Sequence, residues 1–179
     1  YIQELDKTYS DWFCIPRSIK TTTVKPSGTV SLLPPDVDPG IHYPHGEYII
    51  RRVEFTKGSK ILLALEEAGY KTEQHHNKKD TKVVEFPVKH GNFKKSKETT
   101  TIWEQLENAA MMQRYWADNS VSITVDMKPN EEKDLNDALE RYQHSLKTGS
   151  LLPLKTHGYK QAPYEVITEE QYKTMIKSI

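Results

Sequence analysis

The sequence has a single cysteine, Cys14, among its 179 residues, and this scarcity excludes an internal disulfide framework. Because such usage is typical of reducing compartments, we expect a cytoplasmic protein. The sequence also lacks any run approaching the roughly 20 apolar residues of a membrane-spanning helix, and no secretory signal peptide opens it. An excess of one charge is missing too: 25 basic residues balance 25 acidic ones, which gives no reason to expect a nucleic-acid or membrane partner.

The residues that are present fit a polar chain with a modest core. Apolar residues make up 36% of the sequence, enough for one small domain or for part of a larger domain with many polar loops. The chain starts at Tyr1 rather than at methionine, so we expect a processed or trimmed product. No internal repeat and no low-complexity boundary divides it.

The most informative stretch runs from Thr21 to Ser31. Three threonines and a valine favour extended backbone, and Pro26 should end that strand because it cannot donate a ladder hydrogen bond. Ser27 is a good helix N-cap, and Gly28 lets a ligand approach the backbone closely. A strand that turns through such residues into a helix presents free N–H groups and a positive dipole end, which together suit a phosphate. An ordinary capped turn remains an equal alternative from these residues alone.

Helical and strand patterns alternate along the rest of the chain and predict an α/β fold. We expect helices over residues 59–68 and 102–117 and from Pro129 to near Gly149, with caps at Ser59 and at Thr100 or Thr101, and a last short helix from Thr168. Strands are expected over residues 19–24, 81–88 and 120–127, and an apolar segment over 48–55. The polar residues 71–80 should form an exposed connection that could hold a hairpin partner for the following strand.

Five residues that could carry chemistry are better explained without a catalytic or metal-binding role. Cys14 lies in a short apolar patch with no neighbouring acid or base, so we expect a buried hydrophobe rather than a nucleophile. His42 and His45 are three residues apart, but Pro44 between them argues against a helix that presents both to a metal. His75, with its neighbour His76, lies in a polar stretch and is expected to be solvated. We therefore assign no catalytic and no metal-binding residue.

Three signatures follow one another along the chain. The first runs from Thr22 to Leu33 and continues with Pro39-Gly40-Ile41-His42 and His45-Gly46-Glu47-Tyr48; the second is Gln113-Arg114-Tyr115-Trp116-Ala117-Asp118-Asn119-Ser120-Val121-Ser122; the third is Gln161-Ala162-Pro163-Tyr164-Glu165. In this order they resemble the adenosylcobalamin-dependent (class II) ribonucleotide reductases. The four-residue turn Pro26-Ser27-Gly28-Thr29 could recur by chance in unrelated proteins. Three signatures in the same order over nearly the whole chain are far more specific.

The resemblance implies a ten-stranded α/β barrel, of which residues 1–179 would form the C-terminal portion, with a tail from about residue 150 packing on its outside. In that family the Pro-Ser-Gly-Thr loop holds the phosphates of the ribonucleotide substrate. The resemblance therefore implies a substrate-binding loop made of Pro26, Ser27, Gly28, Thr29 and Val30.

The family's chemistry begins at adenosylcobalamin and makes a cysteine thiyl radical, which takes the ribose 3′ hydrogen before a cysteine pair reduces the 2′ carbon. The thiyl cysteine stands in an Asn-Pro-Cys-x-Glu loop, which this sequence lacks, and Cys14 in Trp-Phe-Cys-Ile-Pro does not match it. The redox cysteine pair, the cysteine-bearing tail and the N-terminal nucleotide-binding region are missing as well. The resemblance thus implies an oxidoreductase that is active only with an N-terminal polypeptide carrying the catalytic cysteines and with a thiol reductant system. We expect a split reductase or a fragment of one.

Two alternatives stay open at this point. One is a fragment of a reductase that is fed by a separate radical-generating metal subunit, whose related loop usually has a bulkier acidic residue where Gly28 stands. The other is a noncatalytic module that only binds nucleotide phosphates. Dependence on cobalamin would exclude the first, and co-purification with a chain that carries the cysteine loop would argue against the second.

Overall fold

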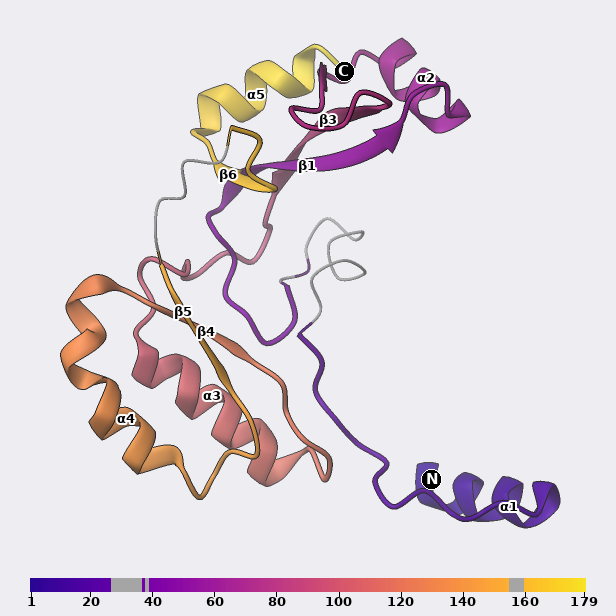
Figure 1. The fold of residues 1–179 in the computed structure, drawn as a ribbon, viewed down its shortest axis with the longest axis vertical. Coiled ribbons are helices and arrows are strands. Elements are labelled where there is room, and N and C mark those ends of the chain that lie inside the picture. The colour runs from indigo at the N-terminus through magenta and orange to yellow at the C-terminus, as the bar shows by residue number, and fades with distance from the viewer. Residues whose placement is uncertain (27–36, 38, 155–159) are drawn as a thin grey trace. The chain divides into compact units, whose positions relative to one another are not determined.

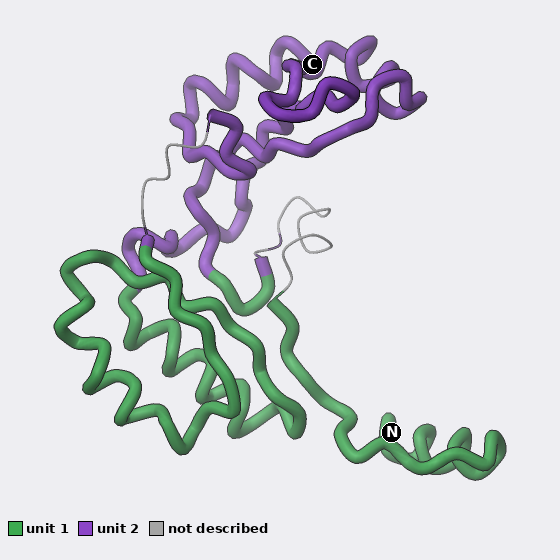
Figure 2. Tube along the Cα trace, viewed as in Figure 1, with its two compact units in different colours: residues 1–27, 40–42, 101–153 green, residues 28–39, 43–100, 154–179 purple. Residues whose placement is uncertain are grey.

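The computed structural model describes residues 1–26, 37, 39–154 and 160–179. The described residues fall into two compact units, each built from separate stretches of the chain (Figure 2). The first unit takes those within Tyr1–Ser27, Gly40–His42 and Thr101–Pro153, and the second takes those within Gly28–Pro39, Tyr43–Thr100 and Leu154–Ile179.

The first unit has its core between helices and a short parallel sheet. Helix α3 (Ile102–Tyr115) and helix α4 (Leu135–Tyr142) pack beside strands β4 (Thr124–Met127) and β5 (Ser150–Pro153), and a 3-10 turn, η2 (Pro129–Asp134), precedes α4 (Figure 1). The core residues they share are Ile102, Leu106, Ala109, Val121, Ile123, Val125 and Ala138. The predicted helix at 102–117 is confirmed. The strand predicted at 120–127 begins only at Thr124, because the side chain of Gln113 accepts the Val121 N–H.

Buried polar side chains fix α3 against β4. The Thr101 hydroxyl and the Glu104 carboxylate cap the first turn of α3 reciprocally, which confirms one of the two predicted caps. The Gln105 side-chain amide, 4% exposed, donates to the Asp126 carbonyl at 2.8 Å and accepts from the Asp126 N–H at 2.9 Å. One glutamine therefore supplies both hydrogen bonds that a neighbouring strand would otherwise provide.

Helix α1 (Ile2–Phe13) opens the chain and ends at Cys14 in the left-handed conformation, with φ +53°. Its Tyr9 ring meets Trp12 edge-on at 5.4 Å, and both rings are exposed. The prediction that Cys14 is buried is wrong: the thiol is exposed, because the helix ends at this residue and the side chain lies outside its last turn.

The second unit is a four-stranded antiparallel sheet in the order β2-β3-β1-β6, made of Thr72–Gln74, Thr81–Lys89, Tyr48–Thr56 and Tyr164–Val166. Strand β2 is the hairpin partner expected in the polar stretch 71–80. Strand β3 continues past Pro87, which the sequence placed near its end. β2 pairs only as far as Val84, so Pro87 lies on an open edge, where its missing N–H costs no ladder bond.

Two capped helices complete this unit. Helix α2 (Lys60–Glu67) begins at Ser59, whose hydroxyl accepts the Leu62 N–H, and helix α5 (Glu169–Lys177) begins at Thr168, as predicted. Gly69 follows α2 with φ +90°, and a Cβ there would lie 2.4 Å from the carbonyl oxygen of Ser178. Glycine is thus required for the chain to turn here and for the end of α5 to approach.

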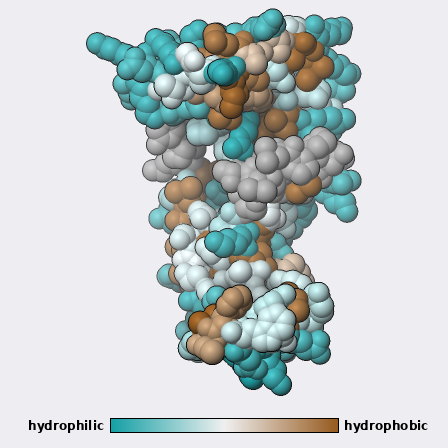
Figure 3. Space-filling model, turned by 90° about the vertical axis from the view of Figure 1, so that its right-hand side faces the viewer, coloured by the Kyte–Doolittle hydropathy of each residue, from teal (hydrophilic) through white to brown (hydrophobic). Residues whose placement is uncertain are grey.

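Many large apolar side chains remain exposed in both units. They include Tyr1, Ile2, Trp12, Phe13, Ile15, Ile19, Ile61, Leu63, Tyr115, Trp116, Leu151, Leu152, Val166 and Ile176. On the face that Figure 3 shows, hydrophobic side chains lie between hydrophilic ones. Within the described residues, no helix is long and apolar enough to cross a membrane.

Candidate functional site

The stem that leads into the predicted phosphate loop, Thr21 to Pro26, is held by one carboxylate. Asp118, which follows α3, accepts the Thr21 N–H at 3.0 Å and the Thr22 N–H at 2.9 Å. The Thr22 hydroxyl donates to the Trp116 carbonyl at 2.8 Å and accepts the Asp118 N–H at 3.1 Å. Two segments 97 residues apart in sequence are joined at this point, and these segments belong to the first and second signatures.

The backbone N–H groups of Thr21 and Thr22 lower the pKa of Asp118 to about 2, well below its ordinary value of 3.8. The carboxylate is therefore fully ionised at neutral pH. The predicted strand at 19–24 is wrong in its form: these residues are described but form no strand, because an aspartate side chain takes the N–H groups that a neighbouring strand would have bound.

The turn that presents Asp118 is itself fixed by Gln113. The Gln113 side-chain amide donates to the Ala117 carbonyl at 2.9 Å and to the Asn119 carbonyl at 2.8 Å, and its oxygen accepts the Val121 N–H at 2.9 Å. Lys147 donates to the Asp118 carbonyl at 2.8 Å. Together these bonds hold the turn at residues 117–121, so the carboxylate is preorganised rather than free to rotate away.

Both flanks of the predicted loop are tied to the same core. Before the loop, Val24 packs against the apolar core of the first unit. After it, Ile41 is buried in that core, and His42 Nε2 accepts the Thr124 N–H at 3.1 Å. His42 is thus structural, as expected. Gly40, which directly precedes Ile41, has φ +66°, a left-handed backbone conformation that glycine permits.

The predicted site residues themselves fall mostly outside this description. Pro26 is described and exposed at the end of the stem. Ser27, Gly28, Thr29 and Val30 lie outside the described residues, and so does the helix expected to follow them. The structure therefore describes how the stem and the returning segment are held, and the phosphate loop remains a prediction.

The third signature lies in the second unit, against β1. Arg52 of β1, 11% exposed, donates to Glu85 at 3.0 Å, to the Ala162 carbonyl at 3.0 Å and to Glu165 at 2.6 Å. Glu85 is buried, and despite the cost of its burial the hydrogen bonds from Lys71 and Arg52 lower its pKa. This pairing fixes the segment before β6, as the charged side chains need partners in a partly buried place.

Aromatic and amide contacts extend the same attachment. His45 stacks on Tyr164 with ring centroids 4.8 Å apart, and the Arg51 guanidinium lies 5.6 Å from that ring. Gln161 donates to Glu73 at 2.9 Å and accepts the His76 N–H at 2.9 Å. The third signature is therefore a docking segment that contacts strands β1 and β2 through side chains.

The part of the chain that the structure describes contains no group of three or more His, Cys, Asp or Glu residues that could hold a metal ion.

The prediction that His75 is simply solvated is wrong. Its Nδ1 accepts the N–H groups of Asn77 and Lys78, and its Nε2 lies 3.2 Å from Glu54, so His75 shapes the turn before β3.

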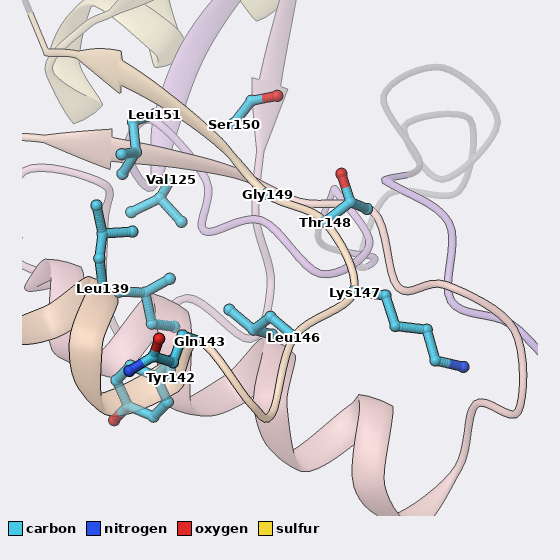
Figure 4. Close-up of a pocket in the computed structure, with 11 residues that line it drawn as sticks. Val125, Leu139, Tyr142, Gln143, Leu146, Lys147, Thr148, Gly149, Ser150 and Leu151 are labelled. Carbon is cyan, nitrogen blue, oxygen red and sulfur yellow. The ribbon is translucent and has the colours of Figure 1, made fainter.

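One cavity of about 240 Å³ lies in the first unit between α4 and β5 (Figure 4). Its lining includes five aliphatic side chains: Leu106, Val125, Leu139, Leu146 and Leu151. Tyr142 also lines it, but its hydroxyl donates to Glu107 at 2.7 Å, and burial with that hydrogen bond raises its pKa. The Tyr142 hydroxyl is therefore engaged by Glu107 and not free for acid–base chemistry in this cavity.

Sequence reasoning missed three of the residues that do the holding: Asp118, Gln113 and Lys147. The signal for the first two was an amide five residues before an acid at the end of a long helix, which reads as an ordinary helix stop. For Lys147 nothing in the local pattern indicates a partner, since it bonds to a segment far along the chain. The adjacent arginines Arg51 and Arg52 do predict contacts with anions or carboxylates, and Arg52 confirms this with Glu85 and Glu165, although the sequence does not indicate which carboxylates.

No family model matches the chain. Among curated proteins it is similar to the probable adenosylcobalamin-dependent ribonucleoside-triphosphate reductase of Dictyostelium discoideum, 46% identical over 182 residues, covering 99% of this chain and 24% of that protein. The adenosylcobalamin-dependent ribonucleoside-triphosphate reductase of Euglena gracilis is also 46% identical, over 181 residues, with 99% and 25% covered.

A solved structure gives the same result in three dimensions. The crystal structure of a B-12-dependent (class II) ribonucleotide reductase matches with a TM-score of 0.86 and 37% identity, covering 99% of this chain and 25% of that one. The chain therefore spans about a quarter of the length of the relatives it matches.

Proposed function

Because the chain is homologous over nearly its whole length to one quarter of the adenosylcobalamin-dependent (class II) ribonucleotide reductases, we propose that it supplies the substrate phosphate-binding loop of such an enzyme. The loop is Pro26, Ser27, Gly28, Thr29 and Val30. The complete enzyme would convert ribonucleotides to deoxyribonucleotides by thiyl radical chemistry. In it, residues 1–179 would be the C-terminal portion of a ten-stranded α/β barrel, with the tail from about residue 150 on the outside.

The observation that carries this proposal is the attachment of both flanks of the loop to one core. Asp118 binds Thr21 and Thr22 before the loop, and Thr124 binds His42 after it. A phosphate-binding loop must have its N–H groups in place before the ligand arrives, because ordering it during binding would lower the affinity. The hydrogen bonds on both flanks of the proposed loop fix its two ends before a ligand arrives.

No residue of this chain is assigned to adenosylcobalamin. When bound in the complete enzyme, the cofactor would supply the initiating radical. The part proposed for this chain is to bind and orient the substrate phosphates.

The remaining chemistry needs a partner. The only cysteine in residues 1–179, Cys14, is exposed and stands outside any cysteine loop, so in the proposed enzyme the thiyl residue and the redox pair would lie in an N-terminal polypeptide, and a thiol reductant would supply the electrons. The exposed apolar side chains of both units suit burial against such a polypeptide. The names of the relatives favour cobalamin over the alternative of a metal subunit.

Reconstitution tests the partner. The purified chain with adenosylcobalamin, a thiol reductant and ribonucleotide should form no deoxyribonucleotide, and adding the N-terminal polypeptide should start turnover. Product formation by the chain alone would refute the need for a partner. Turnover with iron or manganese and a metal subunit, but without cobalamin, would assign the chain to the other reductase class.

Substitutions in the reconstituted enzyme test the loop. Gly28→Val should raise the KM for ribonucleotide by roughly ten- to a hundredfold, since the branched side chain fills the space of a phosphate oxygen and so displaces the phosphate from its charge-assisted hydrogen bonds. Ser27→Ala should have a smaller effect. Gly149→Val is the matched control, because a Cβ at Gly149 has no atom within 4 Å. Normal nucleotide affinity in Gly28→Val, or a loss of cobalamin affinity instead, would overturn the assignment.

A further inference from the structure

A second hollow of about 430 Å³ lies in the first unit beside the turn that carries Asp118. Its lining residues are Gln113, Arg114, Ala117, His144, Ser145, Leu146 and Lys147. Three of them can be cationic and none is acidic. A hollow of this size falls in the range of small-molecule sites, and its lining is suited to an anion.

The cationic side chains of this hollow are not paired with an acid. Among the described residues, no carboxylate forms an ion pair with Arg114, His144 or Lys147. Asp118 keeps its negative charge near Lys147, but its carboxylate oxygens bond to the N–H groups of Thr21 and Thr22. The lining itself therefore holds two permanent positive charges, those of Arg114 and Lys147, and no negative one.

Two of the residues that line the hollow, Gln113 and Lys147, are held in place by hydrogen bonds. Gln113 bonds to three backbone groups of the turn, and Lys147 donates to a backbone carbonyl rather than to an acid, which leaves its full charge. Figure 4 shows the Lys147 side chain running away from the aliphatic residues of the neighbouring cavity. Its charge is thus kept apart from that apolar wall, while Leu146 gives the hollow an apolar contact.

We propose that this hollow, which we call the Arg114 pocket, binds a phosphorylated small molecule. Arginine presents a planar fork of donors that matches two phosphate oxygens, and lysine adds a point charge. The pocket is built from residues of the first unit alone, so the proposal does not rest on the phosphate loop.

Titration of the 179-residue chain with inorganic pyrophosphate at constant low ionic strength tests the pocket. Amide NMR shifts should move at residues 113–118 and 144–147, and the fitted affinity should fall roughly tenfold in Arg114→Gln, which loses a charge-assisted contact. Arg114→Lys keeps the positive charge but not the planar guanidinium, so its affinity for pyrophosphate should lie between those of the native chain and Arg114→Gln. Arg141→Gln is the matched control, since Arg141 is exposed on α4 and does not line the pocket.

The Gly28→Val variant separates this pocket from the proposed loop. Shifts at residues 113–118 should persist in it with unchanged affinity. Three results would each overturn the proposal: no shifts at these residues in the native chain, equal affinity in Arg114→Gln and the native chain, or loss of the shifts in Gly28→Val, which would place the anion at the loop.

Discussion

Replacing Gln113 by leucine should destabilise the first unit, because one side chain makes three hydrogen bonds there. Leucine is close in size but offers no polar atom. The Val121 N–H is then left without a partner next to a fully buried side chain, which costs about 1–3 kcal/mol. The Asn119 carbonyl lies nearer to solvent and can bond to water, so it adds less, whereas Ala117 is buried and the loss of the bond to its carbonyl adds to the cost.

The sum is roughly 2–3 kcal/mol of unfolding free energy, which corresponds to a melting temperature lower by about 4–12 °C in a chain of this size. Tryptophan fluorescence measures this unit specifically, because Trp12, Trp103 and Trp116, the chain's three tryptophans, all belong to it. A melt followed at this signal therefore avoids the second unit.

Gln143→Leu is the control. Gln143 is an exposed glutamine whose side chain donates only to the Glu140 carbonyl, so its loss should change the unfolding free energy by less than about 0.5 kcal/mol. If both variants melt within 2 °C of each other, the turn at residues 117–121 is not held by Gln113. The amide of Thr21 should also exchange faster in Gln113→Leu only, since the Asp118 carboxylate depends on that turn.

Three further outcomes are expected. Because the pKa of Asp118 lies below its ordinary value, the contribution of this carboxylate is present above pH 4 and lost as the pH falls towards 2, so protection of the Thr21 amide should decline in that window and be flat in Asp118→Asn. Arg52→Met should cost about 3 kcal/mol by leaving buried Glu85 short of a partner, and Arg52→Met with Glu85→Leu should recover part of it; no recovery would contradict the pairing. Cys14 should react fully with a thiol reagent in the native chain, and Cys14→Ala should keep reconstituted turnover within a few fold; a dead enzyme would return it to the mechanism.

The helices of this protein follow from short-range sequence patterns. Ser59, Thr101 and Thr168 each begin a helix through a hydrogen bond to a residue three positions later, and all three starts were predictable. Such contacts form within one turn of chain and need no distant partner. The α/β class and the order of the three signatures are likewise properties of the sequence.

Only the tertiary structure decided how those signatures are held. Asp118 meets Thr21 across 97 residues and Arg52 meets Glu165 across 113, and neither pairing has a local signal, because such contacts exist only once the intervening chain has folded. The same cause explains the errors: Cys14 became exposed where a helix ended, and the threonine stretch gave its N–H groups to a carboxylate instead of a strand. Local patterns determine which elements form, whereas long-range side-chain hydrogen bonds determine where the binding segments are fixed.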